Sequence, residues 1–393
     1  MHVRLIGILS ITFTGSLVVA GCTPAAEESA AASSEPAAAT GTLVADSTRS
    51  TESGSGDWQV IEPGADTVCS DGSAYRFFVR AADPAKLLVY FQGGGACWFP
   101  ENCDTHLQPS YKVNVADDDP SRYDGIFALT NPDNPFLEYS MVIAPYCTAD
   151  THMGDRQTSY QAPATEDHTA HELTIHHRGF VNSNAVLDWI YGAYSNPAEI
   201  FVTGSSAGSI PSPYFAWQIA AQYPGARIAQ LGDASGGYRR SATTNTDRML
   251  QWGTLDYLAS RHPEFSEVTE DAFNYELLYI KAAQARPDIL FAEYDAAEDT
   301  VQKRFLALGG STADSLLDLL RANHRDIRAE VSNFRTYVGP GDSHTILGRP
   351  EFYTAESDGV RIRDWVADLA AYRTVQNVEC DPCVLPAAAG KAD

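Results

Sequence analysis

The chain has 393 residues, of which 44% are hydrophobic and 10% aromatic, enough to build a large buried core. Acidic side chains outnumber basic ones by 51 to 27, for a formal net charge of −24. Such a surface repels nucleic acids and anionic lipid headgroups. The composition therefore disfavours a nucleic-acid-binding function.

The N-terminus has the pattern of an export signal. A short basic start, Met1 to Arg4, precedes an apolar run, Leu5 to Ala20, which ends at Gly21 and Cys22. A run this short that ends in small residues is typical of a cleaved signal peptide rather than a membrane span. A cysteine directly after Ala-Gly is the pattern of bacterial lipoproteins, so we expect residues 1–21 to be removed and Cys22 to carry the lipid. The alternative is an ordinary signal peptide in which Cys22 stands by chance.

Composition divides the rest of the chain. Residues 22–56 are rich in Ala, Ser, Thr, Glu and Gly and predict a flexible tether. Residues 57–385 have globular patterning and predict a single domain, and residues 386–393 predict a disordered tail. The protein is thus expected to be exported and anchored by lipid in the bacterial cell envelope, at the periplasmic face or the cell surface.

Six cysteines remain after Cys22: Cys69, Cys97, Cys103, Cys147, Cys380 and Cys383. An even number in an oxidising compartment favours disulfides. Cys97 and Cys103 are close enough to close a small loop, and Cys380 with Cys383 is interpreted as a local link in the tail.

Apolar strand-like runs alternate with helical patterns along the domain. The predicted strands are 86–91, 140–144, 198–203, 289–295 and 334–338, and the predicted helices include 183–194, 214–222 and 313–323. Continuous apolar strands alternating with helices favour an α/β fold with a mainly parallel sheet covered on both faces.

The clearest chemical motif is Gly204–Gly208 (GSSAG), which follows a predicted strand and precedes a predicted helix. In this context GxSxG indicates a nucleophile elbow, a strained turn that exposes a serine. Ser206 is the central residue and the predicted nucleophile.

A second motif, Gln92–Trp98 (QGGGACW), directly follows the strand that ends at Phe91. Hydrolases of this type place a glycine-rich oxyanion loop there. We expect the backbone N–H groups of Gly94, Gly95 and Ala207 to form the oxyanion hole.

In this fold the acid and the histidine follow the serine along the chain. His344 lies in a loop after a predicted strand and is the expected base, in preference to His262 and His324. Asp295 ends a strand-like run and is the expected acid. The other candidates are Asp299 as the second choice, Asp342 as a weaker one and Asp233, which is plausible on structural grounds.

Four histidines, His168, His171, His176 and His177, invite a metal-binding interpretation. Their spacing matches neither HExxH nor the common zinc patterns. Exposed histidines in a loop and a strand explain them more simply, so the sequence predicts no metal and no cofactor.

Several segments together resemble the pectin acetylesterase and Notum carboxylesterase family, over nearly the whole domain. They are Cys69–Ser73 (CSDGS), Gln92–Trp98, Pro145–Asp150 (PYCTAD), Arg178–Gly179, Gly204–Gly208, Asp233–Ala234 and Tyr294–Asp295. The chain departs from the family where Gln92 replaces a glutamate, where Ala96-Cys97-Trp98 replaces Gly-Trp-Cys, and where Ala296-Ala297-Glu298 replaces Ser-Trp-Gln.

The resemblance implies an α/β-hydrolase fold, a catalytic triad of Ser206, Asp295 and His344, and disulfides Cys69–Cys147 and Cys97–Cys103. It also implies a serine carboxylesterase with a Ser-His-Asp mechanism that removes acyl groups, acetyl being the expected one, from a polysaccharide or another ester. The alternatives are a glycan-binding lipoprotein without turnover and a serine peptidase on the same fold.

Overall fold

A computed structural model describes residues 58–64, 66–239, 251–270 and 272–383. The predicted signal peptide, the predicted lipidation site Cys22, the predicted tether at 22–56 and the predicted tail at 386–393 lie outside the described residues. Among the residues that are described, no helix is both long and apolar enough to cross a membrane.

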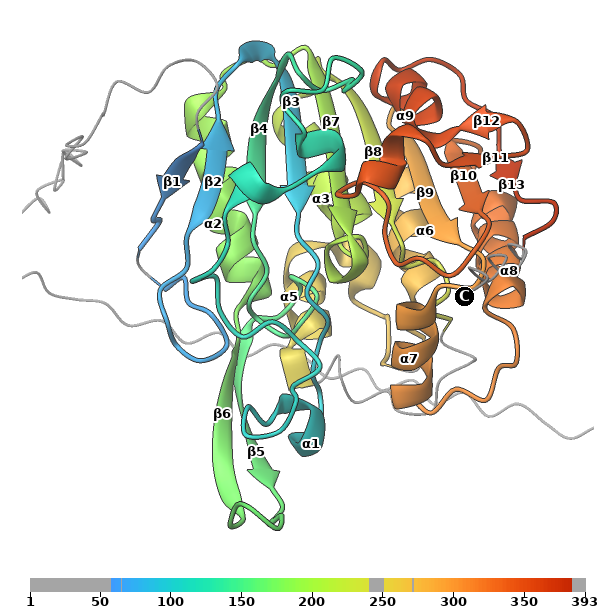
Figure 1. Ribbon diagram of the computed structural model, residues 1–393. Helices are drawn as coiled ribbons and strands as arrows, with labels where there is room; N and C mark the ends of the chain where they lie inside the picture. Colours follow the sequence, from blue (N-terminus) through green and yellow to red (C-terminus); the bar gives the residue numbers. More distant parts are fainter. Residues whose placement is uncertain (1–57, 65, 240–250, 271, 384–393) are drawn as a thin grey trace, which may run out of the picture. The chain divides into compact units, whose positions relative to one another are not determined.

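A nine-stranded sheet runs through the described part of the chain, in the order β1-β2-β4-β3-β7-β8-β9-β10-β13 (Figure 1). Its strands are β1 (Gln59–Ile61), β2 (Phe77–Arg80), β3 (Asp83–Phe91), β4 (Tyr139–Ala144), β7 (Glu199–Ser205), β8 (Arg227–Asp233), β9 (Leu290–Ala296), β10 (Phe334–Gly339) and β13 (Val378–Glu379). Only β2 pairs antiparallel with its neighbours, β1 and β4; the other pairings are parallel. All five predicted strands are present, and the predicted mainly parallel sheet is confirmed.

Both faces of the sheet are covered because side chains alternate along each buried strand. In β3, Leu87, Val89 and Phe91 pack into a core on one face, while Leu88 and Tyr90 pack into a second core on the other. The first core also contains side chains from α2 (Gly179–Ala193), α3 (Ser212–Gln222), α5 (Thr254–Arg261), α6 (Tyr275–Ala285) and α8 (Leu316–Glu330). The second contains side chains from α9 (Ile362–Ala370) and from the 3-10 turns Gly125–Phe127 and Pro350–Tyr353.

The three predicted helices are also present, with shifted ends. Helix α2 begins before the predicted 183–194 segment, and α8 begins and ends later than the predicted 313–323 segment. The remaining described elements are α1 (Pro100–Cys103), α7 (Thr300–Leu308), the β5–β6 hairpin (Arg156–Ala162 and His171–His177), the β11–β12 hairpin (Glu356–Ser357 and Val360–Arg361) and the 3-10 turns Pro120–Arg122, Ser206–Gly208 and Pro263–Phe265. The β5–β6 hairpin extends away from the main sheet, with α1 beside it (Figure 1).

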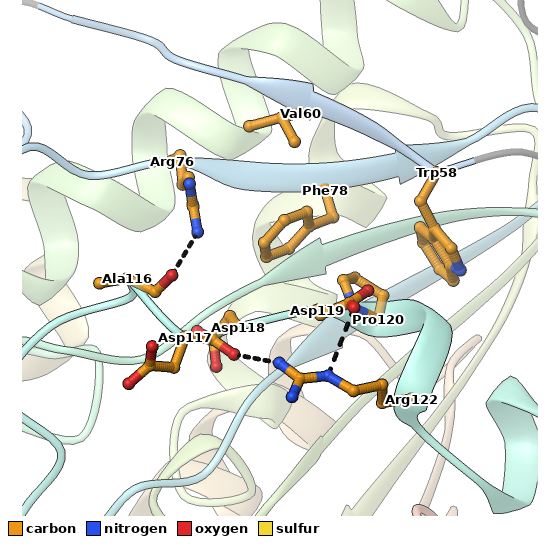
Figure 2. Close-up of a pocket in the computed structure, with 10 residues that line it drawn as sticks. All are labelled: Trp58, Val60, Arg76, Phe78, Ala116, Asp117, Asp118, Asp119, Pro120 and Arg122. Carbon is orange, nitrogen blue, oxygen red and sulfur yellow. Dashed lines mark hydrogen bonds and ion pairs between the residues drawn. The ribbon is translucent and has the colours of Figure 1, made fainter.

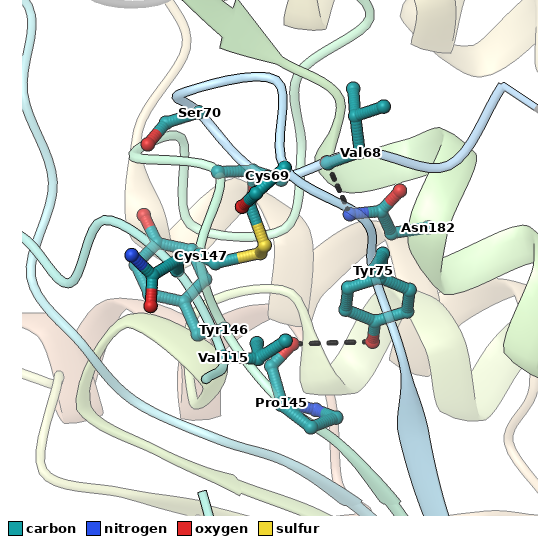
Figure 3. The surroundings of a disulfide bond; sticks show 12 residues. Val68, Cys69, Ser70, Tyr75, Val115, Pro145, Tyr146, Cys147 and Asn182 are labelled. Atoms are coloured by element: carbon teal, nitrogen blue, oxygen red, sulfur yellow. Dashed lines mark hydrogen bonds between the residues drawn. A yellow bond between two sulfur atoms is a disulfide. The ribbon is translucent and has the colours of Figure 1, made fainter. Parts of the chain in front are cut away.

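Three disulfides link the described chain: Cys69–Cys147, Cys97–Cys103 and Cys380–Cys383. All three predicted pairings are therefore confirmed. The first joins residues 78 positions apart and fastens the segment before β2 to the loop after β4 (Figure 3). Beside it, the Tyr75 hydroxyl donates to the Pro145 carbonyl, and the Asn182 amide of α2 donates to the Val68 carbonyl (Figure 3). These contacts hold the Pro145–Asp150 loop next to the carboxyl end of β4.

Candidate active site

The predicted nucleophile stands at the end of a central strand. Strand β7 ends at Ser205, and Ser206 follows in a 3-10 turn that leads into α3. Ser206 has φ of 55°, in the left-handed region that a residue with a side chain adopts only under strain. This strand–turn–helix geometry is that of a nucleophile elbow, as the GSSAG motif predicted.

Two glycines allow the elbow to turn so sharply. A Cβ atom on Gly204 would lie 2.1 Å from the Gly208 carbonyl oxygen, and one on Gly208 would lie 2.1 Å from the Phe91 carbonyl oxygen. Both distances are shorter than any real carbon–oxygen contact. The motif therefore needs glycine at these two positions, because the turn packs directly against the end of β3.

The glycine-rich loop after β3 passes beside the elbow. A Cβ on Gly93 would lie 2.8 Å from the Cβ of Ser206, so the loop backbone runs next to the predicted nucleophile. The loop is fastened on its other side, where the Lys112 amide donates to the Gly94 carbonyl and the Ala96 amide to the Ser110 carbonyl. Within the described part of the chain, this pairing does not use the N–H group of Gly94 or of Gly95, an arrangement that would suit an oxyanion loop.

Gln92, which replaces a glutamate of the resembled family, holds the start of this loop. Its side-chain oxygen accepts hydrogen bonds from the Lys112 ammonium at 2.7 Å and the Tyr146 amide at 3.1 Å. Its side-chain nitrogen donates to the Tyr123 hydroxyl at 2.7 Å. The amide thus makes both acceptor and donor contacts, and Asp118 supplies the negative charge that pairs with Lys112.

His344 pairs with Asp299 and not with Asp295. The Nδ1 atom of His344 lies 2.7 Å from Oδ2 of Asp299, whose side chain is fully buried. Nε2 of His344 has no hydrogen-bond partner among the described residues. The sequence-based choice of Asp295 as the histidine's partner is therefore wrong, and the second choice, Asp299, occupies that place.

The position of Asp299 follows from the helix that it begins. Asp299 is the N-cap of α7, and its Oδ1 accepts hydrogen bonds from the amides of Val301 at 2.9 Å and Gln302 at 3.0 Å. A carboxylate at a helix N-terminus is stabilised by these unpaired amides and by the helix dipole. The cap leaves Oδ2 to face the histidine.

Asp295 lies on the other side of the same turn, in a buried polar cluster. Its Oδ1 accepts from the Gly236 amide at 3.0 Å and the Gln302 side chain at 2.8 Å, while Oδ2 lies 3.8 Å from Nε2 of His324. Glu293, two residues earlier on the same face of β9, lies 3.0 Å from that nitrogen. Burial and the neighbouring Glu293 charge raise the pKa of Asp295 to about 7.

His324, on α8, is therefore paired with these two buried carboxyl groups and not with the predicted nucleophile. Its desolvation is outweighed by hydrogen bonds and charges from Asp295 and Glu293, which raise its pKa to about 9.

Sequence reasoning missed Gln302, whose Nε2 donates both to Asp295 Oδ1 at 2.8 Å and to Asp299 Oδ2 at 3.2 Å. The available signal was the spacing of Asp299 and Gln302, since an N-cap followed three residues later by Glu or Gln marks a helix start.

Asp233 joins the elbow to the histidine loop. At the end of β8, its Oδ2 accepts from the Ser205 hydroxyl at 2.6 Å and the Leu347 amide at 3.1 Å, and its Oδ1 accepts from the Ile346 amide at 3.0 Å. Burial raises its pKa to about 6 although these hydrogen bonds oppose the shift. One carboxylate thus ties the residue before Ser206 to the segment directly after His344.

The remaining candidates lie apart from this arrangement. The Asp342 side chain is exposed, and its carbonyl accepts the Thr300 amide. His262 lies between Tyr214 and Gln218 on α3, 3.2 Å from the tyrosine hydroxyl and 3.1 Å from the amide nitrogen. His177 is buried and lies 2.9 Å from the Tyr160 hydroxyl.

A pocket of about 430 Å³ lies elsewhere, against the edge strand β1 and its neighbour β2 (Figure 2). Trp58, Val60 and Phe78 line it from the strands, and the acidic loop at 117–119 lines it from the opposite side (Figure 2). Neither Ser206 nor His344 contributes to it, so this pocket is separate from the candidate active site.

Sheet order, elbow and glycine loop together define an α/β-hydrolase. The profile of the pectinacetylesterase family matches residues 50–261, a little over half of the chain, and the chain belongs to that family. This confirms the resemblance drawn from the motifs.

The chain is also similar to individual members of the wider group. It is 24% identical over 144 residues to palmitoleoyl-protein carboxylesterase notum1a from Danio rerio, a match that spans 36% of this chain and only 27% of that relative. The structure of the Wnt deacylase Notum from Drosophila superimposes with a TM-score of 0.53 at 15% identity, covering 79% of this chain and 93% of the other. That superposition confirms the fold.

A pH-dependent stability is predicted from Asp150, at the end of the PYCTAD segment. Burial raises the pKa of this carboxyl from 3.8 to about 7, against hydrogen bonds from Thr148 and the amides of Gly179 and Gly154. Between pH 4 and pH 7 the folded state then keeps a proton that the unfolded state has lost, so the group's contribution to stability falls as pH rises. The slope is at most about 1.4 kcal/mol per pH unit.

The measurement is chemical denaturation of the wild type and of Asp150→Asn at several pH values from 4 to 7. The variant is expected to be less stable, because asparagine accepts fewer of these hydrogen bonds. The difference in free energy of unfolding between the two proteins should shrink as pH rises. A constant difference across this range would contradict the raised pKa.

Proposed function

We propose that this protein is a serine carboxylesterase in which Ser206, His344 and Asp299 form the catalytic triad. Ser206 attacks the ester carbonyl as its proton passes to Nε2 of His344, and the resulting imidazolium then protonates the leaving alcohol. Water repeats the two steps on the acyl-enzyme and releases the acid. Membership of the pectinacetylesterase family supports hydrolysis of an ester as the reaction.

The observation that carries the proposal is the hydrogen bond between His344 Nδ1 and Asp299 Oδ2 at 2.7 Å. When Nδ1 carries the proton and donates it to the carboxylate, Nε2 bears the lone pair that a general base needs. Nε2 has no other partner within the described chain, and the side chain is 16% exposed. The imidazole is thus oriented by its acid, and its buried Nε2 has no competing hydrogen-bond partner among the described residues.

The backbone N–H groups of Gly94, Gly95 and Ala207 are proposed to hold the oxyanion. Two observations support this: the glycine loop passes next to Ser206, and the hydrogen bonds that fasten the loop within the described chain engage the Gly94 carbonyl but not the N–H group of Gly94 or Gly95. Losing one such donor typically costs about 10²–10³-fold in kcat.

For the substrate, we propose a short acyl group, acetyl in the first place, on a neutral polysaccharide or another small ester. The family description supports acetyl esters, whereas the curated relative carries the name of a palmitoleoyl-protein carboxylesterase. A net charge of −24 disfavours a polyanion such as unesterified pectin, although salt screens this repulsion beyond about 8–10 Å. The acyl-chain length that the enzyme hydrolyses fastest would distinguish an acetyl esterase from an enzyme that removes long acyl chains.

Export and lipid anchoring at Cys22 are proposed as well, and they rest on the N-terminal sequence alone. Three disulfides in the described domain agree with an oxidising compartment.

The first prediction of this proposal concerns the nucleophile. Ser206→Ala should abolish hydrolysis of a nitrophenyl ester series and labelling by a fluorophosphonate, since no other group supplies the attacking oxygen. In the wild type, acetate should be hydrolysed with a higher kcat/KM than octanoate. Ser205→Ala serves as the comparison: it should still be labelled, although more slowly than the wild type, because it keeps the nucleophile but loses the hydrogen bond to Asp233. Labelling of Ser206→Ala at another serine would rule out the assignment.

The second prediction separates the two carboxylates. Asp299→Asn should lower kcat by about 10³–10⁴-fold, because the amide favours the wrong imidazole tautomer. Asp295→Asn should change kcat by less than about tenfold, because Asp295 makes no contact with His344. Thermal denaturation of both variants controls for folding. A crippled Asp295→Asn beside a fully active Asp299→Asn would exclude Asp299 from the triad.

The third prediction concerns the anchor. Expressed with its signal, Cys22→Ala should move from the membrane fraction to the soluble fraction, since lipidation needs the thiol and the following segment has little apolar surface. Immunoblotting of fractionated cells measures this. Sedimentation of Cys22→Ala with membranes would show that another feature holds the protein there.

A further inference from the structure

A cluster of potential metal ligands lies between α1 and the β5–β6 hairpin, outside the candidate active site. One ligand atom each from Asp104, His106 and His171 lies within 4.8 Å of the other two. Nδ1 of His106 is 3.0 Å from Asp104 Oδ1, and Nε2 of His171 is 3.5 Å from Asp104 Oδ2. The imidazole of His168 lies against that of His106, with ring centres 4.5 Å apart.

Tertiary structure assembles this cluster from two distant segments. Asp104 and His106 directly follow the Cys97–Cys103 disulfide at the end of α1, whereas His168 and His171 belong to the turn and the first residue of β6. The hairpin and α1 lie side by side, away from the main sheet (Figure 1). An analysis of residue spacing considers only side chains that are close together in the sequence, so it could not reveal Asp104 and His106 as partners of His171.

The hydrogen-bond geometry of His171 is the second observation that points to a cation. Its Nδ1 lies 3.1 Å from the Thr169 carbonyl, an acceptor, so Nδ1 carries the proton. In the neutral ring Nε2 then bears a lone pair, yet it is buried without a hydrogen-bond partner and faces the carboxylate of Asp104. Two lone pairs directed at each other repel unless a positive charge lies between them. Metal-bound histidines commonly show this arrangement, with the second ring nitrogen donating to a carbonyl.

We propose that Asp104, His106 and His171 bind a divalent transition-metal ion of the Zn²⁺ class, with His168 or water completing the coordination. Imidazole and carboxylate are standard zinc ligands, at about 2.0–2.2 Å. A tetrahedral site then places neighbouring ligand atoms roughly 3.4 Å apart, and the 3.5 Å between His171 Nε2 and Asp104 Oδ2 fits that edge. The Asp104 side chain is only 4% exposed, whereas that of His106 is 50% exposed and can turn toward the ion.

The site is structural rather than catalytic and does not depend on the proposed esterase function. The bound ion would cross-link the hairpin to the disulfide-closed loop at 97–103. That loop is followed by Ser110, Tyr111 and Lys112, which pair with the glycine-rich loop. A metal here would therefore stabilise the outer support of the oxyanion loop without touching Ser206.

The test uses the full chain in detergent, stripped with a chelator and titrated with Zn²⁺ in competition with a chromogenic zinc indicator. The wild type is expected to bind one equivalent with micromolar or tighter affinity. His171→Ala and His106→Ala should each weaken binding at least about tenfold. Thermal denaturation with and without Zn²⁺ gives an independent readout, because a ligand that binds only the folded state raises Tm.

His176→Ala is the matched control, because it also removes a histidine from β6. His176 is an odd number of residues from His171, so its side chain points to the other face of the hairpin. This variant should bind Zn²⁺ like the wild type and keep the Zn²⁺-dependent rise in Tm, which His171→Ala should lose. Two results would overturn the proposal. One is that the wild type shows no saturable zinc binding, which is the result expected if His171 and Asp104 form only an ion pair. The other is equal affinity in His171→Ala and His176→Ala.

Discussion

The buried carboxylate of Asp233 is the contact on which the candidate active site depends. It accepts hydrogen bonds from the Ser205 hydroxyl and from the amides of Ile346 and Leu347, and so joins the nucleophile turn to the histidine loop across the sheet. Burying a carboxyl without a cationic partner is costly, and its pKa, raised to about 6, reflects that cost. The hydrogen-bond donors that offset this cost are the same groups that align the nucleophile turn with the histidine loop.

The geometry of β9 explains how two carboxylates four residues apart receive different environments. Side chains on one face of β9 point toward α6 and α8, where Glu293 and Asp295 meet His324. The strand continues through Ala296, and the chain turns before Asp299 caps α7 at the carboxyl edge of the sheet. Ligands and catalytic groups of open parallel sheets gather at that edge. Gln302 contacts both carboxylates and fixes their relative positions.

The outer loops are supported by covalent and polar links rather than by the main core. The Cys69–Cys147 disulfide holds the segment that ends at Asp150, and the Cys97–Cys103 disulfide closes the loop beside the hairpin. A small separate cluster, with Tyr111, Tyr160 and Ile175, packs around the second disulfide. The proposed ion at Asp104, His106 and His171 would add a third kind of link where this cluster ends.

Local patterns in the sequence determined the parallel strands, the elbow at Ser206, the glycine loop, the base candidate His344 and the disulfides, because each depends on residue types within a short window or on the family resemblance. The partner of His344 was decided only by tertiary structure. Sequence analysis places the end of a strand only to within about two to four residues, which is comparable with the separation of Asp295 and Asp299 along the chain. The ligand cluster was likewise hidden, since residues 104–106 and 168–171 meet only when the hairpin packs beside α1.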